Sequence, residues 1–304
     1  MTTKSFPPRF FIGLVLFIAS AVFLTLGVPL IKSWFYAFAW WSFLVILDGV
    51  NSRRLGRSVL FKKPADLLAA ALVSVPAWLI FELYNLRLKN WSYHDLPPSL
   101  LIRAVGHLVA FATVLPALME LAAFFKPGLE RLLRPARPLP VTRTGLAAST
   151  GIGLVLLVLP LLWPKLFFPF VWMGFIFLLE PLNYRAGRAS LLGDLEKGHL
   201  VRLLSWMAAG LSAGILWESF NFWAGSHWEY HLPYLSLGRI FQMPVFGYLG
   251  FIPFALEIFA LEAVLTGFYA RIRPKMIFRI LLWTGYAAFD VAAFILIEAF
   301  TVVR

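Results

Sequence analysis

The sequence predicts an all-α integral membrane protein with nine membrane-spanning helices. Three observations point to this fold class. First, 61% of the residues are hydrophobic and only 14% are charged, whereas a soluble domain carries about 25% charged residues. Second, the mean hydropathy is positive, at +0.80. Third, apolar runs of roughly the 20 residues that a spanning helix needs alternate with short basic clusters.

The predicted spans follow these apolar runs along the chain. They cover residues 10–31, 34–50, 67–84, 104–125, 145–163, 166–183, 203–222, 239–266 and 278–299. The first run is longer than a signal-peptide core and continues through Val28-Pro29-Leu30, so we expect it to be retained as a span.

Basic residues predict how the chain is oriented. Most of the 27 Lys and Arg residues fall in the N-terminus and in the segments after the second, fourth, sixth and eighth predicted helices. Because cytoplasmic loops carry the excess of Lys and Arg, the N-terminus is predicted to be cytoplasmic and the C-terminus outside. We therefore expect a multi-pass protein of the cell membrane. The net charge of +12 is therefore explained by the membrane topology and by attraction to anionic lipid headgroups. No nucleic-acid partner is expected.

Composition also excludes several kinds of chemistry. The chain has no cysteine, which rules out disulfides, thiolate metal sites and cysteine nucleophiles. The five histidines form no HExxH pattern, and no glycine-rich phosphate loop or serine-nucleophile elbow is present. No metal site is predicted from these motifs.

The two halves of the sequence resemble each other. "FELYNLRLKNWSYH" matches "WESFNFWAGSHWEYH", and "VPLIKSWFYAFAWW" matches "LPLLWPKLFFPFVW". Each repeat holds four predicted helices, an even number, so both repeats should share one orientation. We expect a first repeat in residues 1–137, a second in 138–270, and a ninth helix in 271–304.

Acids and asparagines recur three residues apart, a spacing that puts both side chains on one helix face. One tier of polar residues is predicted at the cytoplasmic ends of helices: Asp48, Asn51, Arg53, Arg57, Glu180, Asn183, Arg185 and Arg188. A second tier, near the outer ends, contains Glu82, Asn85, Glu218 and Asn221. Near an interface such groups serve either function or helix registry. The deeper acids Glu120, Glu257 and Asp290 favour function, because an acid at the bilayer centre costs about 2.5–3.5 kcal/mol on insertion scales.

The outer segments that follow the second-tier pairs are rich in aromatic residues. Trp91, Tyr93, Trp228 and Tyr230 lie in "LKNWSYHDLPPS" and "SHWEYHLPYLS". Such residues belong either to an interfacial aromatic belt or to a re-entrant lid over a cavity.

Buried carboxyls beside aromatic rings suit proton-transfer chemistry on an apolar substrate. A protonated carboxyl in a dry pocket can protonate an alkene, aromatic faces stabilise the carbocation, and a second carboxylate or a histidine removes the final proton. We expect Glu82 and Glu218 to be the main acids or bases, followed by Glu120 and Glu257. Asn85 and Asn221 are expected to orient the carboxyls. The predicted substrate-binding residues are Asn85, Asn221, Trp91, Trp228, Tyr93, Tyr230 and Asp290.

The motif "FELYNLRLKNWSY" followed by "LPALME", repeated as "WESFNFWAGSHWEY" and "IPFALE", resembles the small membrane lycopene cyclase domain family. That family has an acid, a tyrosine about 11 residues later, and then a proline followed by acids. Glu82 and Tyr93 match this interval, and Glu218 and Tyr230 lie one residue further apart. The resemblance implies cyclisation or hydration of a long isoprenoid or carotenoid-like lipid without a cofactor.

Two alternatives stay open. The nine-helix layout, with polar motifs at the cytoplasmic ends of the second and sixth helices, resembles the intramembrane aromatic prenyltransferase family. This implies a prenyl diphosphate held by Mg²⁺ and arginines, although each motif here has one acid where the family has two or three. Repeats and buried acids also suit a lipid or small-solute transporter. A scaffold role, with purely structural polar pairs, is a further reading.

Overall fold

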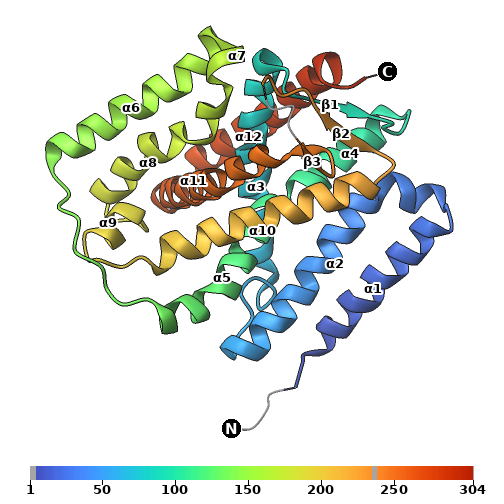
Figure 1. Cartoon of the computed structure of the whole chain (residues 1–304), viewed down its shortest axis with the longest axis horizontal. Coiled ribbons are helices and arrows are strands. Elements are labelled where there is room, and N and C mark those ends of the chain that lie inside the picture. The colour runs from blue at the N-terminus through green and yellow to red at the C-terminus, as the bar shows by residue number, and fades with distance from the viewer. Residues whose placement is uncertain (1–4, 235–237, 304) are drawn as a thin grey trace.

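The computed structural model describes residues 5–234 and 238–303, and the chain is mainly helical (Figure 1). Its helices are α1 (Pro8–Thr25), α2 (Pro29–Leu55), α3 (Pro64–Leu88), α4 (Leu100–Phe111), α5 (Val114–Leu132), α6 (Arg143–Leu162), α7 (Pro164–Phe167), α8 (Gly174–Arg185), α9 (Leu191–Leu195), α10 (Val201–Trp223), α11 (Phe251–Ile272) and α12 (Met276–Phe300). Two 3₁₀ segments, η1 (Phe168–Trp172) and η2 (Val245–Gly250), precede α8 and α11. The short strands are β1 (Trp91–His94), β2 (His227–Tyr230), β3 (Arg239–Ile240) and β4 (Met243–Pro244).

Length and composition confirm a multi-pass helical membrane protein. Eight helical segments among the described residues are long and apolar enough to cross a bilayer. The predicted span at 203–222 forms as α10 but is not among these eight, because its polar and charged residues lower its hydropathy. The exposed faces of α1 and α12 carry large apolar side chains such as Phe11, Val15, Leu281 and Ile295, as expected for contact with lipid.

Three predicted helices are broken or shortened. The span predicted at 104–125 divides into α4 and α5 at Ala112 and Thr113. The span predicted at 166–183 is interrupted by η1, where Pro169 occupies the first turn of the 3₁₀ segment. The span predicted at 239–266 begins as α11 only at Phe251, after β3, β4 and η2.

The helices pack in two similar sets. In Figure 1, α1 lies along α2 on one side of the molecule, and α6 lies along α8 on the other. The helix α5 contacts α2 and α3, and likewise α11 contacts α8 and α10. The helix α10 also packs against α5 and joins the two sets, while α12 packs on α3. Trp40, Phe81 and Phe254 are fully buried in the resulting core.

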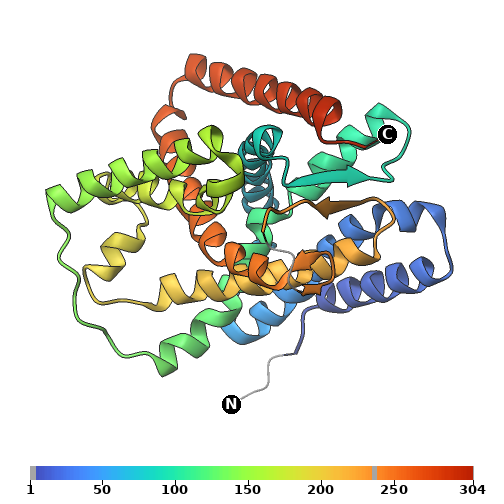
Figure 2. The same ribbon diagram turned by 45° about the horizontal axis from the view of Figure 1, so that its top comes forward.

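The two aromatic segments, for which an interfacial belt or a re-entrant lid was the expectation, form a small sheet. Strands β1 and β2 pair antiparallel, with Trp91 opposite Tyr230 and Tyr93 opposite Trp228 (Figure 2). The C-terminus joins them, because Tyr93 N donates to Thr301 O and Val303 N donates to Tyr93 O. We call this end of the bundle the sheet end, and the opposite end, with residues 56–63 and 186–200, the loop end.

Candidate functional site

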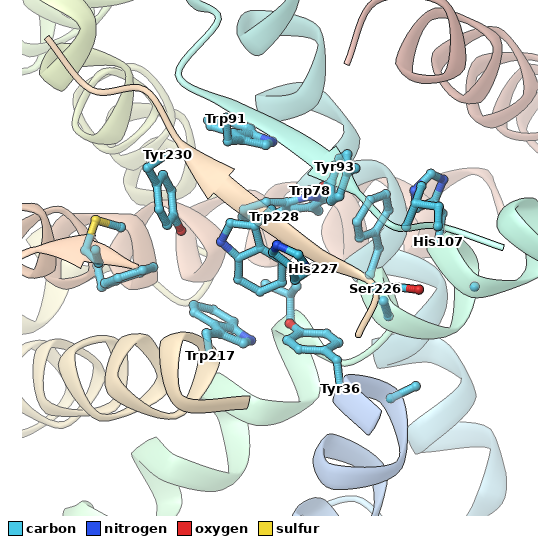
Figure 3. A pocket seen from close by; sticks show the side chains of 18 of the residues that line it. Tyr36, Trp78, Trp91, Tyr93, His107, Trp217, Ser226, His227, Trp228 and Tyr230 are labelled. Atoms are coloured by element: carbon cyan, nitrogen blue, oxygen red, sulfur yellow. The ribbon is translucent and has the colours of Figure 1, made fainter. Parts of the chain in front are cut away.

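A cavity of about 220 Å³ lies at the sheet end, between the two sets of helices. Its wall is largely aromatic, and it includes Tyr36, Trp78, Trp91, Tyr93, Trp172, Trp217, Trp228, Tyr230, Phe251 and Phe254. Figure 3 shows that β1 and β2 contribute rings from both halves of the chain to this wall. The lining residues Ile102 and Phe246 are 43% and 60% exposed, so the cavity reaches the protein surface between α4 and η2.

Glu82 lies behind one part of this wall, fully buried on α3. Its Oε1 accepts hydrogen bonds from Trp78 Nε1 at 2.8 Å, Tyr93 Oη at 2.5 Å and Trp91 Nε1 at 3.1 Å. Trp91 Nε1 also lies 3.3 Å from Oε2. Three lining residues therefore direct their polar edges toward one carboxyl and their aromatic rings along the cavity.

Glu218 occupies the corresponding place on α10 and is also fully buried. Its Oε1 lies 2.8 Å from Tyr230 Oη. Its Oε2 has no hydrogen-bond partner within the described part of the chain, and neither have the indole nitrogens of Trp217 and Trp228. By hydrogen-bond geometry the second carboxyl has one partner where the first has three, although the indole of Trp228 lies near Glu218.

A single substitution between the repeats explains part of this difference. Trp78 lies four residues before Glu82, one helical turn away, whereas Gly214 lies four residues before Glu218. The ring of Phe251 fills the space beside Gly214, where even a Cβ atom would collide with it. Since a tryptophan cannot fit there, Glu218 lacks the donor that Trp78 gives to Glu82.

Asn85 and Asn221 hold the strands rather than the carboxyls, which corrects the expected orienting role. Asn85 Nδ2 donates to Trp91 O at 2.8 Å, and its Oδ1 accepts from Asn90 N. Asn221 Nδ2 donates to Trp228 O at 2.8 Å, and its Oδ1 accepts from Trp228 N. Neither amide lines the cavity described above. Both place the strand tryptophans, and through them the tyrosines two residues later.

The strand tyrosines are held as hydrogen-bond donors. Burial raises the pKa of the Tyr93 and Tyr230 hydroxyls well above the usual value, and the nearby carboxyls of Glu82 and Glu218 raise it further. Both hydroxyls therefore keep their protons at neutral pH.

The deeper acids do not lie together, although Glu120 and Glu257 align in the sequence. Glu120 accepts a hydrogen bond from Asn51 Nδ2 at 2.7 Å, so it joins the loop-end residues. Glu257 instead accepts a hydrogen bond from Phe175 N at 2.8 Å, in the first turn of α8. Because the first N–H groups of a helix have no partner within it, Glu257 caps the helix that η1 interrupts. Neither acid lines the cavity.

Asp290 lies on α12, apart from the residues that line the cavity. It is partly exposed, and its Oδ1 finds no hydrogen-bond partner over residues 5–234 and 238–303. The structure gives it no contact with the proposed substrate cavity.

The loop-end acids have matching structural roles. Asp48 Oδ1 accepts from Ser58 Oγ at 2.6 Å and from the backbone N–H of Val59 at 2.8 Å. Glu180 Oε2 accepts from Ser190 Oγ at 2.8 Å and from Leu192 N at 3.0 Å. Each acid therefore fastens the loop that follows its own helix.

Other loop-end residues serve packing and pairing. Arg9 Nε makes an ion pair with Asp48 at 2.7 Å, and Asn183 Nδ2 donates to Ala260 O at 2.9 Å. The guanidinium of Arg53 lies over the Phe6 ring. Arg185 lies in the last turn of α8, and Arg188 lies beside Gly267 of α11. Arg57 follows Gly56, the left-handed residue that ends α2.

The same acids are the candidates for holding a metal ion. No group of three His, Asp or Glu side chains that could hold a metal ion occurs in residues 5–234 and 238–303. Both oxygens of Asp48 are engaged, as is Oε2 of Glu180, whereas Oε1 of Glu180 has no hydrogen-bond partner among the described residues.

Sequence patterns alone left out several residues of the cavity wall. Trp78 could have been recognised, because it lies on the same helix face as Glu82. Tyr36, Trp217 and His107 come from three different helices, and no spacing in the sequence connects them. Comparison with protein-family models, with curated proteins and with solved structures finds no match to this chain.

Proposed function

We propose that this protein is an integral membrane enzyme that protonates a double bond of an isoprenoid or carotenoid-like lipid, in a cyclase-like or hydratase-like reaction. One observation carries the proposal: Glu218, with an unpartnered carboxyl oxygen, is hydrogen-bonded to Tyr230, which lines an aromatic cavity. An apolar wall around this volume suits one end of a hydrocarbon chain. Aromatic faces suit the positive charge that protonation creates.

In this reaction Glu218 is the proton source and Tyr230 passes the proton on. A proton is best placed on a buried carboxyl that has few donors, since a buried ionised carboxylate needs several partners. The hydrogen between Tyr230 and Glu218 can lie on either oxygen, because a hydroxyl both donates and accepts. Tyr230 gives its proton to one carbon of the double bond while Glu218 returns one to the tyrosine oxygen.

The proposed reaction needs no oxidant or reductant, because each bond that breaks supplies the electron pair of a new bond. The π pair of the double bond forms the new C–H bond, which leaves a cation on the other carbon. Attack by a second double bond closes a ring, and loss of a proton ends a cyclisation. Attack by water, followed by loss of a proton, ends a hydration. In Figure 3, Trp217 and Trp228 lie between Tyr230 and Tyr36, and all three rings line the cavity in which this charge would develop.

The duplicated architecture forms part of the proposal. The chain consists of two parallel repeats, residues 1–137 and 138–270, and a ninth spanning helix in 271–304, with α10 counted among the nine spans. The strand register supports this arrangement, since Trp91 pairs with Tyr230 as its counterpart Trp228 pairs with Tyr93. A two-fold axis between equivalent strands produces this register. With the N-terminus cytoplasmic, the cavity lies in the outer half of the bilayer.

The prenyltransferase-like alternative has less support, because Asp48 and Glu180 fasten loops. It would require Mg²⁺ beside those acids. A transporter would need a route between the two ends, and the loop-end tier does not contribute to the wall of the sheet-end cavity.

Deuterium incorporation tests the proposed reaction. The purified protein is placed in lipid vesicles with lycopene, an acyclic polyene, in D₂O, and the products are analysed by mass spectrometry. We expect one new C–D bond for each ring or hydrated end. Glu218→Gln should lower product formation about 100-fold or more while the Tm changes little. Product without deuterium, or full activity of Glu218→Gln, would contradict the mechanism. The absence of any lycopene product with the wild-type protein would contradict the substrate class.

A further inference from the structure

His107 is a buried titratable residue that takes no part in the proposed proton donation by Glu218 and Tyr230. It lies on α4, is 8% exposed and lines the aromatic cavity. Figure 3 shows it beyond Tyr93, on the side of the cavity away from Tyr230 and Trp217. Neither Nδ1 nor Nε2 has a hydrogen-bond partner among the residues that the structure describes. A buried polar group without a partner costs stability. The presence of an unpartnered imidazole at this position therefore needs an explanation other than stability.

Neighbouring rings hold the imidazole in place without using its nitrogens. The ring stacks on Phe111, with centroids 5.3 Å apart and an interplanar angle of 7°. Tyr93 and Phe294 contact it at centroid distances of 5.3 and 5.6 Å. The position is therefore set by packing, and both nitrogens are left for a group in the cavity.

The charged neighbours of His107 are already paired with each other. Arg103 lies one turn before it on α4, and its Nε donates to both carboxylate oxygens of Glu298 at 2.9 Å. Arg103 Nη1 also donates to the carbonyls of Pro97 and Pro98 at 2.8 Å. This ion pair ties α4 to α12 and holds the helix that carries His107. It does not occupy the imidazole.

We infer that His107 is the proton acceptor of the reaction, placed across the cavity from the Glu218–Tyr230 donor. The inference deepens the proposed function and rests on it. The lone pair of a neutral imidazole nitrogen takes a proton from the carbon next to the cation. The electrons of that C–H bond become the new double bond, and the cation is neutralised. His107 then releases its proton to water, and Glu218 regains one from water, so no oxidant or reductant is needed.

Separating donor from acceptor has a chemical consequence. If one residue did both steps, the proton could return along the path by which it came, and the starting material would form again. Two groups on opposite sides of the cavity favour loss of a different proton, and therefore product. His107→Gln should keep the protonation step but impair the final step.

The test follows deuterium in both the product and the recovered lycopene. With His107→Gln in D₂O, we expect cyclised product to fall about 100-fold, while deuterium still enters recovered lycopene and the share of hydrated product rises. Glu218→Gln should give no deuterium in either fraction. His94→Gln, a histidine of β1 that is bonded to Ser92, is the matched control and should behave as wild type. Wild-type yields and product ratios for His107→Gln would overturn the inference.

A second measurement does not depend on turnover. Diethyl pyrocarbonate modifies neutral imidazole nitrogens, and mass spectrometry locates the modified residue. We expect His107 to react in empty vesicles and to be protected in vesicles that contain lycopene, whereas His94 reacts equally in both. If wild-type protein makes no product from lycopene, the proposed substrate class fails, yet protection of His107 still supports its contact with bound lipid. A His107 that does not react, or is not protected, overturns the inference.

Discussion

Glu82 and Glu218 occupy equivalent places in two similar helices, yet their surroundings differ. Both carboxyls are fully buried, and each bonds to a tyrosine on the strand that follows its helix. Glu82 also accepts from two indole nitrogens, whereas Oε2 of Glu218 has no partner among the described residues. A buried carboxylate that accepts three hydrogen bonds is better stabilised in the charged form than one that accepts a single hydrogen bond. A carboxyl with a single partner is better suited to carry a proton.

In the proposed mechanism, this contrast separates a structural copy from a reactive copy of one motif. The first repeat uses its acid to fix the edges of Trp78 and Trp91. In the second repeat, Gly214 removes one donor and Phe251 occupies its space. A duplicated site can thus keep one half as a rigid wall while the other half acquires chemistry.

The largest difference is expected between the two strand tyrosines. Tyr230→Phe removes the hydroxyl that passes the proton, so turnover of lycopene should fall about 100-fold or more. Tyr93→Phe removes a hydrogen bond to a structural acid, and turnover per folded molecule should stay close to wild type. Product formation in vesicles measures both. Equal losses of activity in the two variants would break the comparison.

For the two acids, the larger loss of stability is expected in the first half of the chain, opposite to the order expected for activity. Glu82→Gln disturbs three donors at once and should lower the free energy of unfolding by about 2–3 kcal/mol. Glu218→Gln disturbs one donor and should cost about 1 kcal/mol. Denaturant unfolding in detergent micelles gives both values. A larger loss for Glu218→Gln would show that Glu218 is the structural acid.

The strand tryptophans provide a matched pair with a smaller effect. Trp91→Phe and Trp228→Phe remove the same atoms from equivalent residues, but only Trp91 Nε1 bonds to a carboxyl. We expect Trp91→Phe to be more destabilising by about 1–2 kcal/mol. Thermal unfolding of the two variants under one condition checks the difference. No difference would mean that the indole hydrogen bond adds nothing to the first site.

The smallest difference is expected between the two asparagines. Asn85→Ala and Asn221→Ala each free the first residues of a strand, so their losses of stability should agree within about 1 kcal/mol. Both strands should move together, because β1 pairs with β2. Hydrogen exchange at the strand amides tests this. If Asn221→Ala abolished turnover while leaving exchange unchanged, the amide would act on Glu218 and not on the strand.

Much of the fold could be predicted from hydrophobic runs, because a bilayer demands continuous apolar helices. The breaks were harder. Pro169 lies inside an apolar run that reads as one span, and the strands β3 and β4 occupy residues that were assigned to the start of a helix. A short sheet between β1 and β2 joins residues far apart in the chain, and local pattern carries no signal for such pairing.

The candidate site was predictable where its contacts are local. The intervals from Glu82 to Tyr93 and from Glu218 to Tyr230 do correspond to hydrogen bonds. The inequality of the two acids depends on Phe251, which comes from a different helix. Likewise, Glu257 caps α8 only because α11 packs beside the break at η1. Such roles arise from tertiary packing, and spacing within one helix does not reveal them.

The central claim is that Glu218 holds a proton in the resting protein and that Glu82 is an ionised acceptor. Infrared spectroscopy of the protein in vesicles measures this directly, since a protonated carboxyl has a C=O band that shifts when H₂O is replaced by D₂O. We predict that Glu218→Gln removes one such band from the wild-type spectrum and that Glu82→Gln removes none. A band that is lost in Glu82→Gln and retained in Glu218→Gln would contradict the account.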